Sequence, residues 1–229
     1  MILAWLYLLN AVILAVLAGF LWRMRMMPAG PYGWFMLWLY IGVVTNVLLF
    51  VSRAVPDATV SLSFWLAGYA SVVFTLLVLL LFVRSFEGGS RFSYLLWTLP
   101  ALFAASFILL GGSAFSLRDE GVWRFDLARR SSLVPRTIMV FYALAAVGYL
   151  AKLYVDVRGG GSERSERGVR YLLIAVAVMF LTNAASPFVR QYVSPLLPVG
   201  EVGFTLGALI IALDLSWLKL KRGAKEAFF

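Results

Sequence analysis

The chain has 229 residues, of which 62% are hydrophobic and only 14% are charged, and its mean hydropathy is +0.91. A soluble domain is closer to half apolar and a quarter charged, so this composition excludes an ordinary soluble protein and predicts an integral membrane protein. The sequence contains no His and no Cys, which excludes disulfides, His or Cys metal sites, His-ligated haem and Ser-His-Asp triads. We therefore expect no cofactor, no metal site and no enzymatic activity.

Seven apolar segments are each long enough to cross a bilayer as a helix, which takes about 20 residues. They lack the alternation, in segments of about 10 residues, that is typical of a membrane β-barrel. The sequence therefore predicts an all-α bundle of seven transmembrane helices over residues 1–222, followed by a short cytoplasmic tail over residues 223–229. The predicted spans cover approximately residues 2–22, 32–51, 62–83, 92–112, 136–155, 171–189 and 199–218.

Lys and Arg are distributed unevenly between the two sides of this predicted bundle. Thirteen of them flank the first, third and fifth connections or follow the last span, against seven on the other side. The positive-inside rule then places the N-terminus outside and the C-terminus in the cytoplasm. The fourth connection works against this orientation, because five basic residues lie in or next to it: Arg118, Arg124, Arg129, Arg130 and Arg136.

The N-terminal stretch MILAWLYLLN is apolar from its first residue. It has no basic region before the apolar run and no small-residue cleavage site after it, and a signal peptide would have both. We therefore expect a retained first helix. The basic excess indicates attraction to the anionic lipids of the cytoplasmic leaflet, and nucleic acid is not an expected partner.

Two connections are long enough to carry structure of their own. The inner one contains Gly159-Gly160-Gly161 and then charged residues; it predicts a flexible hinge, because it lacks the Gly-Lys-Ser/Thr ending of a phosphate-binding loop. In the outer one, residues 115–118 and 122–125 alternate around Asp119-Glu120-Gly121 and predict a small β-hairpin. The hairpin is either a lid over the bundle or an ordinary amphipathic cap, and we favour the cap.

Polar side chains inside membrane spans are costly, so they are the first candidates for a functional site. Several lie in the outer halves of the predicted second, third and sixth spans, and Glu201 lies in the first turn of the last. They could line a pocket that opens outward, but we favour the simpler explanation, which is interhelical hydrogen bonds under about 1 kcal/mol each and, for Glu201, the helix dipole. The candidate ligand-binding residues are Thr45, Asn46, Trp65, Tyr69, Asn183, Ser186 and Glu201.

The last two predicted spans carry features of a packing seam or a switch. Gly203, Gly207 and Asp214 fall on one stripe of a helix, and the two glycines form a small-xxx-small pair suited to close helix contact. Pro187 is expected to kink the sixth span. Asp214 is either a switch or proton-linked carboxylate or, as we favour, one partner of an interfacial ion pair with a nearby lysine.

Two common seven-helix or small-bundle classes are not favoured. A retinal protein needs a Lys in the middle of its last span, and the last predicted span has none before Lys219. A small transporter built from two repeats would show matching Pro- or Gly-interrupted spans, and none is evident.

The second half of the chain has a familiar order of features. An aromatic span with Phe141 and Tyr142 is followed by a basic connection that ends in Arg167-Gly168-Val169-Arg170, a short Ser194–Gly200 turn and a last helix that ends in Ala212-Leu213-Asp214; the second span, with Trp38, is also similar. With these features the chain resembles the N-terminal seven-transmembrane sensor region of bacterial histidine kinases. The resemblance implies signal perception in a bacterial inner membrane and supplies no catalytic residues.

This chain departs from such kinases at its end. In them the last span leads to a kinase core with a phospho-accepting His, whereas here about ten residues follow the last span and there is no His. The resemblance therefore implies an isolated sensor region or a stand-alone relative that signals through a separate protein.

The leading hypothesis is a non-enzymatic receptor that binds a small apolar or amphipathic ligand in the outer half of the bundle and signals through the last two spans. Its expected partners are the lipid bilayer, a signalling protein at the cytoplasmic face and a second copy of the chain. The alternatives are a small ion- or proton-coupled transporter or channel that uses Asp214 and Glu201, and an accessory subunit of a larger complex. These two carboxylates are 13 residues apart, roughly 20 Å along a helix, too far to cooperate as a catalytic pair.

Overall fold

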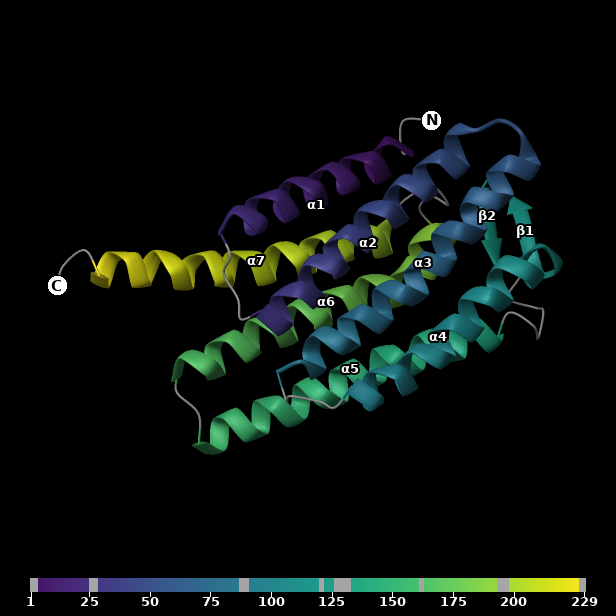
Figure 1. Cartoon of the computed structure of the whole chain (residues 1–229). Coiled ribbons are helices and arrows are strands. Elements are labelled where there is room, and N and C mark those ends of the chain that lie inside the picture. The colour runs from purple at the N-terminus through teal and green to yellow at the C-terminus, as the bar shows by residue number, and fades with distance from the viewer. Residues whose placement is uncertain are drawn as a thin grey trace.

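The computed structural model describes residues 4–24, 29–86, 91–119, 122–125, 133–160, 163–192 and 198–226. In these ranges seven α-helices lie side by side, and a short antiparallel hairpin lies at one end of them (Figure 1). The elements are α1 Trp5–Met24, α2 Ala29–Ala54, α3 Ala58–Arg84, α4 Arg91–Gly111, β1 Ser116–Asp119, β2 Val122–Phe125, α5 Leu133–Gly160, α6 Glu163–Tyr192 and α7 Val199–Glu226. The predicted all-helical bundle is confirmed at this level.

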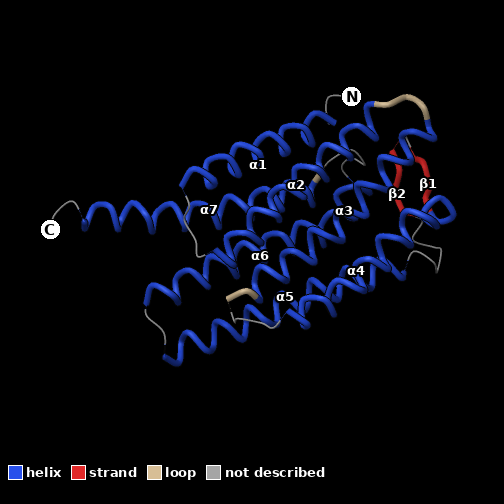
Figure 2. Tube along the Cα trace, viewed as in Figure 1, coloured by secondary structure: helices blue, strands red, loops and turns tan. Residues whose placement is uncertain are grey.

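The two ends of the bundle differ. One end, here the hairpin end, carries the N-terminal end of α1, the α2–α3 turn and the β1–β2 hairpin (Figure 2). At the opposite end, here the tail end, the last turns of α7 project beyond the neighbouring helices (Figure 1). A residue near the start of α7 and one near its end therefore lie at opposite ends of the molecule.

Five helices are long and apolar enough to cross a membrane within the part of the chain that the structure describes. Their apolar stretches are Trp5–Arg23, Gly33–Ala54, Ala58–Arg84, Tyr94–Gly111 and Leu133–Gly159. Large hydrophobic side chains also cover the outside of the bundle; Leu110 of α4, for example, is 87% exposed. Continuous apolar surface of this kind is costly in water and favourable in lipid, so these helices support a membrane protein.

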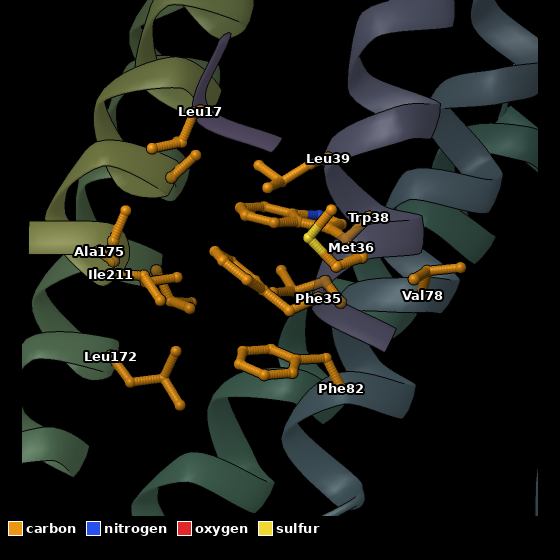
Figure 3. Close-up of a cluster of buried hydrophobic side chains, with 14 of the residues drawn as sticks. Leu17, Phe35, Met36, Trp38, Leu39, Val78, Phe82, Leu172, Ala175 and Ile211 are labelled. Atoms are coloured by element: carbon orange, nitrogen blue, oxygen red, sulfur yellow. The ribbon is translucent and has the colours of Figure 1, made fainter. Parts of the chain in front are cut away.

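The inside of the bundle consists of two clusters of buried apolar side chains. In the first, Trp38 and Phe35 of α2 and Phe82 of α3 follow one another along the bundle, and Ile211 of α7 and Leu172 of α6 lie to one side of them (Figure 3). The second cluster is formed mainly by α3, α4 and α5. Helix α3 contributes to both clusters, packs against α2, α4 and α5, and is the most deeply buried of the five apolar helices, so it is the central helix of the bundle.

The predicted hairpin is confirmed, with Ser116 opposite Phe125 and Asp119 opposite Val122. It is attached to the bundle by a side-chain hydrogen bond, in which Trp123 Nε1 donates to Ser61 Oγ of α3 at 3.1 Å. This contact holds the hairpin against the start of the central helix.

Three segments are more helical than the sequence predicts. Gly159 and Gly160 belong to α5, and only residues 161–162 of the expected hinge lie outside the described residues. Helix α6 continues through Ser186 and Pro187 to Tyr192, and α7 continues to Glu226 into the predicted tail. A glycine inside a helix costs about 1 kcal/mol but does not end the helix. Composition alone therefore overestimates the length of a glycine-rich connection.

Helices α6 and α7 approach each other closely along the glycine stripe. A Cβ on Gly203 would collide with the Thr182 side chain of α6. A Cβ on Gly207 would lie 2.8 Å from Met179 Cγ and 3.0 Å from the backbone oxygen of Ala175. Only glycine leaves room for this contact at these positions, as in other small-residue helix seams.

We expect Gly207→Ala to destabilise the protein by about 1–3 kcal/mol, because the backbone oxygen of Ala175 cannot move aside without shifting α6. The matched control is Gly148→Ala on α5, where a Cβ would meet nothing within 4 Å; it should leave stability unchanged or raise it by up to about 1 kcal/mol. Unfolding by detergent titration measures both variants. Equal stability of the two would show that α6 and α7 are not held by this contact.

Candidate functional site

Thr45 lies on the face of α2 that packs against α3. Its Oγ1 lies 2.8 Å from the backbone oxygen of Ile41 and 2.7 Å from Ser71 Oγ of α3. Ser71 Oγ also lies 2.6 Å from Gly68 O. Because each hydroxyl has one hydrogen, one of the two donates to the carbonyl on its own helix and the other donates across to it. The Thr45 hydroxyl thus forms an interhelical hydrogen bond, the simpler of its two predicted roles.

Trp65 and Tyr69 lie one turn apart on α3, with their ring centroids 4.6 Å apart. Trp65 is buried in the second cluster, and Tyr69 packs against that cluster. Between them, Gly68 lies against Leu49 of α2. The two aromatic rings therefore belong to the packing around the central helix.

Asn183 of α6 contacts the first turn of α7. Its Nδ2 donates to Met179 O at 2.8 Å, and its Oδ1 lies 2.6 Å from where a Cβ on Gly200 would be. Glu201, the next residue, is half-buried, and its backbone oxygen accepts a hydrogen bond from Thr205 Oγ1 at 3.1 Å. The structure thus brings Asn183 beside Glu201.

The side chains of Ser186 and Pro187 lie outside the described residues, although both residues are part of α6. The predicted ligand-binding residues that are described are distributed over four contacts: between α2 and α3, around α3, between α6 and α7 and, for Asn46, where α2 meets α1 and α7.

Asp214 lies at the other end of the same face of α7 as Gly203 and Gly207. Its side chain is 9% exposed, and its Oδ2 lies 3.7 Å from where a Cβ on Gly168 of α6 would be. The stripe predicted from the sequence therefore packs against α6 along its length, with the two glycines toward the hairpin end and the carboxylate toward the tail end.

Sequence reasoning did not single out several of the described buried polar residues, and Asn10 is the one among them with an amide side chain. Asn10 of α1 is 5% exposed, and Asn46 of α2 is 2% exposed. Asn46 Nδ2 donates to Gly42 O at 2.9 Å, and Gly42 packs against Leu14 of α1 and Phe204 of α7. The available signal was a single amide inside an apolar first span, which by itself indicates a side chain directed into the bundle.

Comparison of the chain with family models, with curated proteins and with solved structures finds no match. Among the described residues, no group of three or more acidic side chains comes together as a metal site would require. The functional argument therefore rests on the placement of the polar residues and on α7.

Proposed function

We propose that the chain is a multi-pass protein of a cell membrane, the inner membrane of a bacterium, that crosses it seven times. The hairpin end lies outside and the tail end in the cytoplasm. In support, α6 and α7 contain the apolar stretches 171–189 and 199–218 and pack alongside the five apolar helices. The excess of Lys and Arg belongs to connections of the tail end and to the end of α7, which agrees with the positive-inside rule.

Single-cysteine labelling tests this topology without background, because the sequence has no Cys. Ser113→Cys lies in an exposed position at the hairpin end, and Gly159→Cys lies in an exposed position at the tail end. In intact cells, a membrane-impermeant maleimide should label Ser113→Cys at once and Gly159→Cys only after permeabilisation. Labelling of both variants, or of the second alone, in intact cells would contradict the proposed arrangement.

We further propose that this bundle is a receptor without enzymatic activity. The observation that carries this proposal is the continuity of α7, a single helix from Val199 to Glu226 that joins the polar contacts near Asn183 to the projecting tail end (Figure 1). A ligand in the outer half that changed the packing of α7 would change its tail end as well. A ligand can shift such an equilibrium only through its different affinity for two packings.

The proposed ligand is small and apolar or amphipathic, because it must enter among helices whose surroundings are apolar with few polar groups. The proposed readers of the tail end are a separate signalling protein and a second copy of the chain. The resemblance to histidine kinase sensor regions points the same way and stays a prediction.

Native mass spectrometry of protein released from membrane vesicles tests the receptor proposal. The wild type should retain a small molecule or lipid of defined mass, and the combined variant Asn46→Leu with Asn183→Leu should lose it. Thr98→Val, which removes a hydroxyl bonded within α4, is the matched control and should retain it. If all three proteins retained the molecule equally, Asn46 and Asn183 would be excluded as ligand-binding residues. If the wild type carried no bound molecule, the transporter or the accessory-subunit alternative would be favoured.

A further inference from the structure

Two amide groups buried between α1 and α2 each have an atom without a hydrogen-bond partner: Asn10 Nδ2, a donor, and Asn46 Oδ1, an acceptor. Both side chains are at least nine-tenths buried. A buried polar atom that lacks a partner destabilises the folded protein. In a native structure, such an atom calls for an explanation, for example a water or a ligand.

The two amides lie at the same level of the bundle. In an antiparallel pair of helices, the residue numbers of facing residues have a nearly constant sum. The Trp5 and Phe50 rings are 5.2 Å apart, and a Cβ on Gly42 would lie 3.2 Å from Leu14, so this sum is about 55–56 on both sides of the amides. Asn10 therefore faces the level of Asn46, and the unpaired donor and the unpaired acceptor belong to one polar layer.

This layer is closed by aromatic contacts on both sides. Toward the hairpin end, the Arg53 guanidinium lies over the Tyr7 ring, 4.2 Å from its centroid. Toward the tail end, the Trp38 and Phe204 centroids are 4.3 Å apart. These contacts separate the layer from bulk water.

Helix α7 completes the layer. Phe204 packs against Gly42, and α2 and α7 run antiparallel. Glu201 is one turn before Phe204 in α7, and Asn46 is one turn after Gly42 in α2. Glu201 and Asn46 therefore lie at the same level. Thr205 is buried beside them, and its hydroxyl donates to Glu201 O. The layer therefore lies where α1, α2 and α7 meet, on the helix that we propose as the output.

The chemistry of the two free atoms restricts what can bind between them. Directly between the two amides, a cation would be attracted by Asn46 Oδ1 and repelled by the Asn10 Nδ2–H. An anion would meet the opposite conflict and, in addition, the Glu201 carboxylate at the same level. An apolar group would satisfy neither atom. A hydroxyl group accepts from one and donates to the other, as buried waters commonly do.

We propose that Asn10 and Asn46 together bind one neutral hydroxyl group in this layer, belonging either to a buried water or to the alcohol of an amphipathic ligand. Only the second source rests on the receptor function proposed above. If the first source applies, the layer is a water-bridged joint between α1 and α2.

A double-mutant cycle with Asn10→Leu and Asn46→Leu tests the site by detergent-induced unfolding. Once one amide has been replaced, the hydroxyl group can no longer bridge the two helices. The second substitution, made in that single variant, should therefore shift the unfolding midpoint by less than half as much as the same substitution made in the wild type. Thr45→Val with Ser71→Ala, a directly bonded pair between α2 and α3, provides the positive control for coupling. Additive effects of the two asparagine substitutions would overturn the proposal, and Asn10→Ser with Asn46→Ser replaces the leucine variants if these do not fold.

The source of the hydroxyl is identified by comparing 1-decanol with n-decane. The quantity measured is the change in melting temperature of the wild type minus that of Asn46→Leu, which cancels the effect of each additive on the micelle. This comparison is made once the double-mutant cycle has shown that Asn10 and Asn46 are coupled. If decanol but not decane raises the melting temperature of the wild type more than that of Asn46→Leu, the hydroxyl belongs to a ligand alcohol. If neither additive distinguishes the two proteins, the hydroxyl belongs to water. The second result leaves the site in place even if native mass spectrometry finds no bound molecule and the receptor function fails.

Discussion

The close approach of α6 and α7 at Gly203 and Gly207 determines where α7 lies, and most of the structure depends on that position. In lipid, helices gain little from burying apolar side chains against each other, so close packing has to supply the attraction. The two glycines let α7 approach α6 until backbone and side chains touch. A neighbouring face of α7 then places Phe204 against Trp38 and Gly42 of α2. Helix α7 is thus held from two sides.

The position of α7 determines which polar residues lie next to it. Thr45 and Asn183 use their hydrogen-bonding groups on neighbouring helices or on their own helix. Asn10 and Asn46 do not use all of theirs, and the helix beside them is the one that projects at the tail end. If the proposed site is filled, a change in its occupancy would act on the α1–α2–α7 contact, and a rigid helix would carry a change of tilt or rotation from one end to the other.

The sequence predicted the helices and the hairpin well, but it did not predict which helices contact one another. Apolar runs of about 20 residues and the alternation around Asp119-Glu120-Gly121 were enough for the helices and for the hairpin. The order of the helices around the bundle was not available, because hydropathy shows which segments are buried in lipid but not which segments touch. That α1 contacts α7, and that α3 is central, are properties of the three-dimensional packing.

The candidate site shows the same limit of sequence reasoning. Asn46 was singled out, but it was grouped with Trp65 and Asn183, which pack at other contacts. Its facing residue, Asn10, could be paired with it only through the register of α1 and α2. The glycine-rich connection predicts a hinge, because glycine is frequent in loops, whereas in the structure Gly159 and Gly160 end a helix.

In the proposed receptor, α7 transmits changes at the level of Asn46 to the tail end. Double electron–electron resonance between spin labels at Arg158→Cys on α5 and Leu213→Cys on α7, both exposed positions, measures this directly. Introducing Asn46→Leu should shift or broaden the distance distribution, whereas Thr98→Val on α4 should leave it unchanged. The same distribution in all three folded proteins would contradict the account.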